Sequence, residues 1–274
     1  MASVNTNYGA MVALQQLNQT NSALETTQSR INTGLKVASA KDNGAIFAIA
    51  QGMRSDVAGF GVVKESLDRV SSTVDVAIAA GEAVSDLLVD MKEKALGAAD
   101  ASLTAAQRSA FNEDFTALRD QIATIVSNAE FNGVNLINNS TAGVNALASA
   151  DGSSTITIAD EAIGLSGSIV TLTSTAQLDT VTNASAAVGT IETSLNNLNQ
   201  ALARLGTASK SLSVHSDFVT KLSDVTEKGI GNLVDADLAK ESAKLQALQT
   251  KQQLGVQALS IANSSAGIAL SFFR

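Results

Sequence analysis

The chain has 274 residues, a formal net charge of −8 and a hydrophobic fraction of 45%, to which aromatic residues contribute little because they are only 3% of the sequence. It has no cysteine, which excludes a disulfide framework, a thiolate metal site and a cysteine nucleophile. The acidic balance, with an isoelectric point near 4.7, argues against binding to bulk nucleic acid or to an anionic membrane surface. Proline is absent as well, and this favours long helices without breaks.

The first segment predicts a helix with a coiled-coil seam. No charged side chain occurs before Glu25, and apolar residues recur at alternating spacings of three and four, with Asn21 and Gln28 as polar seam positions. The apolar members of this seam are Leu14, Leu17, Leu24, Ile31 and Leu35. The segment lacks the basic region and contiguous apolar core of a secretory signal peptide.

The next part predicts two helices. Residues 39–44 indicate a break, after which the same spacing runs from Leu67 to Ala95. A turn is expected at 97–102, and Thr104 with Gln107 forms a capping box for a helix that ends at the turn Phe131-Asn132-Gly133.

From residue 141 to about 183 the composition changes to Ser, Thr, Gly and Ala, which indicates a β insert. Residues 155–158 alternate with period two and 168–173 do so less strictly, so we expect a hairpin of short strands there. Helix resumes from Val188 to Val219, and a break is expected at Gly229-Ile230-Gly231. Asp235 or Asp237 can cap the final helix.

The final helix is apolar on more than one side. Its main seam includes Leu238, Leu245, Leu248 and Leu259 and ends at Phe273, and further apolar residues lie off that seam, namely Leu254, Ile261, Ile268 and Phe272. A helix of this kind is normally covered on several sides. Polar residues interrupt the segment, so a membrane span is disfavoured. We therefore expect the two chain ends to pair with each other and then with copies of the same protein.

The predicted fold is mainly α: a long antiparallel helical rod with a small β-hairpin insert, its termini paired as a two-helix coiled coil. No catalytic, cofactor or metal site can be assembled. The one histidine, His215, lies beside an apolar helix seam, and Gly59-Phe60-Gly61 is too short for a phosphate loop. Asp235 and Asp237 lack the rest of a calcium loop. A membrane-active protein and an enzyme are the alternative classes, both disfavoured.

Three groups of residues along the chain form a recognisable set. They are Arg30, Gly34, Ser39, Asp42 and Asn43 near the start, Phe131, Asn132 and Gly133 in the middle, and Asp235, Asp237 and Arg274 near the end. This combination resembles bacterial flagellin, and is most similar to the short alphaproteobacterial flagellins of the Caulobacter type. Two positions depart from enterobacterial flagellins: Asp90 and Lys94 stand where an innate immune receptor recognises an arginine and a leucine.

The resemblance implies a structural subunit that polymerises into the flagellar filament for swimming, outside the cell. Residues 1–42 and 240–274 would form the inner-tube domain, and 43–239 the helical rod with its β insert at about 141–183. It also implies homopolymerisation with identical or paralogous subunits, and an export chaperone, junction proteins and cap proteins as partners. A hook–filament junction protein of the same family is the alternative.

Overall fold

The computed structural model describes residues 6–271, with the side chains of 265–271 excepted. The chain forms two compact units. The terminal unit comprises the chain up to Ser55 together with the chain from Val225 onward, and the central unit is Asp56–Asp224. Helices α2 (Gly44–Ala98) and α4 (Val181–Val234) contribute residues to both units.

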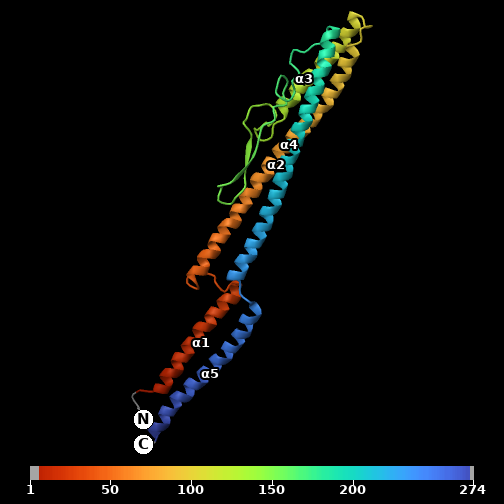
Figure 1. Cartoon of the computed structure of the whole chain (residues 1–274). Coiled ribbons are helices and arrows are strands. Elements are labelled where there is room, and N and C mark those ends of the chain that lie inside the picture. Colours follow the sequence, from red (N-terminus) through yellow and green to blue (C-terminus); the bar gives the residue numbers. More distant parts are fainter. Residues whose placement is uncertain (1–5, 272–274) are drawn as a thin grey trace. The chain divides into compact units, whose positions relative to one another are not determined.

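In the terminal unit, α1 (Tyr8–Thr33) lies antiparallel to α5 (Leu238–Ser271), as Figure 1 shows. Two hydrogen bonds define the register. The Asn7 Nδ2 atom donates to the Ala262 carbonyl oxygen (2.7 Å), and the Gln252 Nε2 atom donates to Asn21 Oδ1 (2.8 Å). Partners that lie later on α1 therefore come earlier on α5. We call this pair of helices the terminal hairpin.

Short side-chain bonds define where the terminal helices begin and end. The Asn7 Oδ1 atom accepts from the Ala10 amide at the start of α1, and Gly34 ends α1 with a φ of 72°, a left-handed conformation that glycine adopts cheaply. Asp237 Oδ1 accepts from the Lys240 amide and caps α5. Between the helices, Leu35 pairs with Asp235 as an isolated β-bridge.

The break between α1 and α2 occurs where the sequence predicted it. The Asp42 carboxylate accepts from the Ala38 and Ser39 amides at 3.1 and 2.9 Å, and Asn43 Oδ1 accepts from the Ile46 amide at the start of α2. These donors, with the Ser39 amide first, lower the pKa of Asp42. However, α2 begins at Gly44, well before the regular seam that starts at Leu67.

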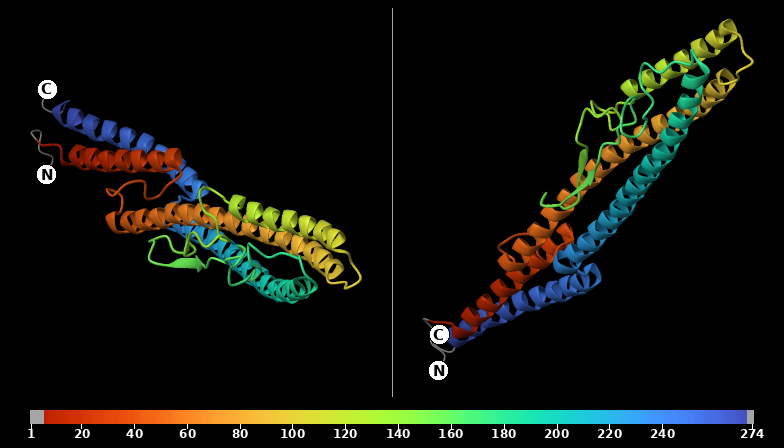
Figure 2. Two further views of the ribbon diagram at one scale, coloured as in Figure 1. Left: turned by 90° about the horizontal axis from the view of Figure 1, so that it is seen from above. Right: turned by 45° about the horizontal axis from the view of Figure 1, so that its top comes forward.

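The central unit packs α2, α3 (Ala105–Asn128) and α4 around one core (Figure 2). The predicted capping box is confirmed, since Thr104 and Gln107 bond reciprocally at the start of α3. The Phe131-Asn132-Gly133 turn is confirmed as well, with φ values of 52° at Asn132 and 81° at Gly133. The largest fully buried side chains come from all three helices and the insert, for example Leu88, Phe115, Ile163, Leu172 and Leu198. Each contributes about 1.5–3 kcal/mol by leaving water.

The insert contains one hairpin, as predicted, and its first strand lies at residues for which no strand was predicted. Strand β2 (Thr155–Ile158) pairs antiparallel with β1 (Val144–Leu147), with Val144 opposite Ile158. The expected strand at 168–173 is wrong. Val170 and Leu172 are buried in the core, and the Thr171 amide donates to the Ser194 hydroxyl of α4. The Thr171 amide therefore has a hydrogen-bond partner without pairing with another strand.

The expected break at Gly229-Ile230-Gly231 is also wrong, because α4 continues to Val234. Ile230 is buried, and a Cβ atom at Gly229 would lie 2.8 Å from the Met53 side chain of α2. Tertiary packing therefore outweighs the cost of two glycines in a helix, about 1 kcal/mol each. The turn expected at 97–102 starts slightly later, because α2 ends at Ala98.

Candidate assembly surface

Reactive chemistry is sparse in the part of the chain that the structure describes. Residues 6–264 hold no group of three or more His, Asp or Glu side chains that could bind a metal ion. The His215 Nε2 atom lies 2.8 Å from the Ala148 carbonyl oxygen, and its ring stands 5.9 Å from that of Phe218. Burial raises the pKa of Asp160, and the neighbouring Glu161 adds to the effect. No described helix has the length and hydropathy needed to cross a membrane.

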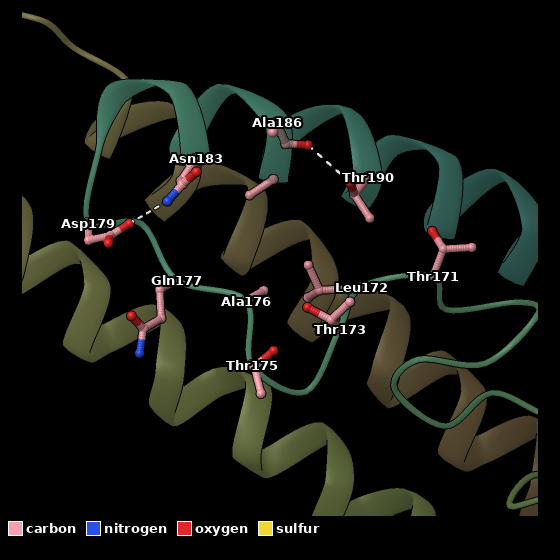
Figure 3. Close-up of a pocket in the computed structure, with 11 residues that line it drawn as sticks. Thr171, Leu172, Thr173, Thr175, Ala176, Gln177, Asp179, Asn183, Ala186 and Thr190 are labelled. Carbon is pink, nitrogen blue, oxygen red and sulfur yellow. Dashed lines mark hydrogen bonds between the residues drawn. The ribbon is translucent and has the colours of Figure 1, made fainter.

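A cavity of about 380 Å³ lies where the insert meets the start of α4. Figure 3 shows threonines and small residues around it, with the Asn183 side-chain amide donating to Asp179 at 2.6 Å. Thr190 donates to the carbonyl oxygen of Ala186 within its own helix. These bonds hold the loop and helix in place, and the one carboxylate of the lining, Asp179, accepts a hydrogen bond from Asn183.

The terminal hairpin packs along a narrow seam. On α5 the less exposed positions are Leu245, Leu248, Gln252, Gly255, Leu259 and Ala262, which follow the spacing seen in the sequence. The helices come close at one point, where a Cβ atom at Gly255 would lie 3.3 Å from Leu17 Cδ1. Leu238, also placed on the seam by the sequence, is 49% exposed.

On α1 the predicted seam is wrong at two of its seven positions, Leu14 and Gln28, which are exposed. Leu17, Leu24 and Ile31 do face α5, but the residues between them are Thr20 and Thr27, which are 7% and 0% exposed. Gln28 and Leu14 lie on the outside instead, and Asn21 is at the edge, where it bonds Gln252. Threonine is smaller than glutamine, and the Thr20 hydroxyl donates to the Gln16 carbonyl oxygen within the helix, so it enters the seam more easily.

One ion pair lies where α1 ends and α5 begins. The Arg30 Nη1 atom is 3.2 Å from Glu241 Oε1, and both side chains are largely covered. Arg30 Nε and Glu241 Oε2 are buried and make no hydrogen bond. The pair links residues near the end of α1 and the start of α5, so it reinforces the antiparallel register.

Large apolar side chains remain on the outside of the terminal hairpin. Tyr8, Met11, Leu14, Leu254 and Ile261 are between 48% and 79% exposed. A shallow groove of about 350 Å³ runs between the helices beside them, lined by Gln16, Leu17, Thr20, Lys251, Leu254, Gly255 and Ala258. Several large exposed apolar side chains on one helix pair are a feature of interaction sites.

Most signature residues of the sequence serve turns and helix ends. Gly34 ends α1, Ser39 and Asp42 form the turn, Asn43 begins α2 and Asp237 caps α5. Asp235 stands in the β-bridge with Leu35. Phe272, Phe273 and Arg274 lie outside the described residues, as does the side chain of Ile268. Sequence reasoning missed Thr20 and Thr27, whose only signal is a spacing of seven residues.

The bacterial flagellin N-terminal helical region matches residues 4–142, and the bacterial flagellin C-terminal helical region matches residues 188–273. The chain belongs to the bacterial flagellin family. Flagellin FljK of Caulobacter vibrioides is 55% identical over 99% of this chain and 98% of its own. A flagellin of Brucella melitensis is 38% identical over the full length of both chains.

Two solved structures share the fold at low identity. Bacillus cereus flagellin aligns with a TM-score of 0.50 at 18% identity, covering 56% of this chain and 88% of that one. A flagellar hook-associated protein from Vibrio parahaemolyticus aligns with a TM-score of 0.58 at 14% identity, covering 71% of this chain and all of that one. The mainly α fold with paired terminal helices and a small hairpin is thus confirmed.

This flagellin is a structural subunit that polymerises into the bacterial flagellar filament for motility, outside the cell. The match to Caulobacter filament flagellins spans the whole chain, so the hook–filament junction alternative is not favoured. The family's members are structural proteins.

Proposed function

We propose that this flagellin polymerises through the outer face of its terminal hairpin. In this proposal the predicted interface residues divide into two sets. Leu17, Leu24, Ile31, Leu245, Leu248 and Leu259 hold α1 against α5, with Leu35 at the end of the hairpin. Leu14, Leu254 and Ile261 face neighbouring subunits, Ile268 and Phe272 continue that face by their spacing, and Phe273 continues the spacing of the seam.

The observation that carries this proposal is the exposure of the outer face. Leu254 is 60% exposed and Ile261 is 64% exposed, and they lie seven residues apart on one side of α5. Each Å² of apolar surface in water costs roughly 25 cal/mol. A second subunit that covers these side chains removes that cost, and a filament repeats the gain at every subunit.

The domain division and the partners are part of the same proposal. Residues 1–42 and 240–274 would form the inner tube, and 43–239 the surrounding rod. The subunit would be secreted with the help of an export chaperone and would meet junction and cap proteins at the filament ends. It would have no catalytic activity and no cofactor, because its contribution is the packing of repeated surfaces.

The test uses the exposed positions rather than the seam. Leu259 is partly covered by α1, so a charge there would also disturb the monomer. Leu254→Asp and Ile261→Asp each place a carboxylate on a surface that is solvent-exposed in the monomer. We expect unchanged monomer helicity and thermal transition, with polymerisation abolished, because an unpaired charge buried in the interface costs several kcal/mol. Seeded polymerisation followed by sedimentation and electron microscopy measures this.

Two controls separate charge from position. Leu254→Met keeps the apolar surface and should polymerise normally. Ser154→Asp adds the same charge at an exposed residue beside β2 and should also polymerise. Long filaments formed by the Leu254→Asp and Ile261→Asp proteins would show that the hairpin face is not the assembly interface.

A further inference from the structure

The methionines of the described residues differ in their access to solvent. Met91 of α2 is 0% exposed in the core of the central unit, and Met53 is partly covered where it packs against Gly229 of α4. Met11 of α1 is 63% exposed. Because an oxidant in solution reacts with the sulfur atoms that it can reach, Met11 is the methionine of this set that such an oxidant attacks first.

The surroundings of Met11 are apolar and carry no charged side chain. Tyr8, three residues before it, is 79% exposed, and Leu14, three residues after it, is 48% exposed. Residues three apart on a helix are neighbours on its surface, so these side chains form one strip along α1. The first charged side chain of the sequence is Glu25, about four helical turns further on. The strip belongs to the outer face of the terminal hairpin, which the proposed function assigns to neighbouring subunits.

Oxidation changes the chemical character of this strip. The lone pair of the methionine sulfur attacks one oxygen atom of hydrogen peroxide, the O–O bond breaks, and the oxygen atom is transferred to the sulfur. The thioether is oxidised by two electrons to a sulfoxide, and the peroxide is reduced to water. The sulfoxide oxygen accepts hydrogen bonds from water while the subunit is free. In a covered, charge-free interface it loses that water, and an acceptor buried without a partner weakens the assembled state.

We propose that Met11 is a modification site at which a peroxide converts the free subunit into a form that does not assemble. The free subunit exposes the sulfur atom and is the sensitive form. In the filament, neighbouring subunits cover the sulfur atom and protect it. The inference rests on the proposed function, because it requires the outer face of the terminal hairpin to be the assembly interface. It adds to that function a chemical control of the same face.

Peptide mapping after peroxide treatment tests the site. Purified monomer is exposed to hydrogen peroxide, and the sulfoxide at each methionine is followed by mass spectrometry, in which fragment ions separate Met11 from Met1. We expect Met11 to be oxidised before Met53 and Met91. In preformed filaments treated in the same way, Met11 should be oxidised more slowly than in the monomer. Equal rates of oxidation at Met11 in monomer and filament would overturn the proposal.

Seeded polymerisation tests the consequence of the oxidation. Peroxide-treated wild-type protein should show a critical concentration about fivefold or more above that of the untreated protein. Treatment with methionine sulfoxide reductases should restore the untreated value. Met11→Leu removes the sulfur and keeps an apolar side chain, and each protein is compared with its own untreated sample, so that the effect of the substitution itself cancels. Peroxide should leave the critical concentration of the Met11→Leu protein unchanged.

The matched control is Met53→Leu, which removes a partly covered sulfur outside the strip and should remain as sensitive to peroxide as the wild type. An unchanged critical concentration for wild-type protein oxidised at Met11, or an equal loss in the treated Met11→Leu protein, would refute the inference. The variants Leu254→Asp and Ile261→Asp test the interface without any oxidant. If they abolish polymerisation while the oxidised wild type still assembles, the modification site is wrong and the proposed function stands.

Discussion

Single glycines decide how closely the insert approaches α2. Gly59 and Gly61 lie two residues apart in the same helix, yet they differ in surroundings. A Cβ atom at Gly59 would lie 2.8 Å from Ala150 Cβ and 2.9 Å from its carbonyl oxygen, whereas nothing lies within 4 Å of one at Gly61. The Gly-Phe-Gly motif therefore serves packing of the hairpin loop on the helix and not phosphate binding.

This difference predicts opposite effects for the same substitution. Gly61→Ala should raise the free energy of unfolding by ~0.5–1 kcal/mol, because alanine is the better helix former. Gly59→Ala should instead lower it by ~1–3 kcal/mol, because the loop must move away. Urea unfolding of the two variants measures this, and equal stabilisation by both would contradict the close approach of Ala150.

At the scale of the elements, the terminal hairpin is weaker than the central bundle. The extended buried cluster of the described chain runs from Val63 to Val219, within the central unit. The hairpin buries few large side chains, and its α1 seam includes two threonines. The Thr20 hydroxyl has a partner in the Gln16 carbonyl, but the buried Thr27 hydroxyl has none. An unsatisfied buried polar group costs ~1–3 kcal/mol.

Valine has nearly the same shape as threonine but lacks the hydroxyl. Substitution by valine therefore tests whether the hydrogen-bonded hydroxyl of Thr20 and the unbonded hydroxyl of Thr27 contribute differently to stability. Thr27→Val should slow the release of the chain ends in limited proteolysis and increase amide protection in α1. Thr20→Val should have a smaller or opposite effect, because it removes a satisfied hydroxyl.

In the wild-type monomer, protease should remove α1 and α5 before it cuts the central unit. Equal resistance of the two units would refute this order.

For the whole molecule, the proposed export would have to deliver α1 intact. The hairpin places Asn7 against Ala262 and Asn21 against Gln252, so removal of some twenty N-terminal residues would delete half of one partner. We therefore expect the secreted protein to retain its N-terminal segment, apart from loss of Met1 before the small Ala2. Intact-mass spectrometry of flagellin from the culture medium measures this. If filaments assemble from protein with a shortened N-terminus, then pairing of α1 with α5 is not required for assembly.

The sequence by itself determined the helices, several of their boundaries and the pairing of the two ends. These features depend on local chemistry: Thr104 with Gln107, the Asn132-Gly133 turn, the Asp42 break, the Asp237 cap and long repeats of apolar residues. The seam of the final helix was predictable from Leu245 to Ala262, because Leu245, Leu248, Gly255, Leu259 and Ala262 keep one spacing, although Leu238 before them is 49% exposed.

Tertiary structure decided the features for which local chemistry allowed two answers. Leu17, Leu24 and Ile31 fit a seam completed by Asn21 and Gln28 as well as one completed by Thr20 and Thr27. The contact with α5 selects the threonines, because they are small and lose less hydrogen bonding on burial. Likewise β2 pairs with β1, since Ile169, Val170 and Leu172 are buried in the core and the Thr171 amide bonds Ser194 of α4. Each choice depends on a partner distant in sequence, and periodicity along one segment carries no information about that partner.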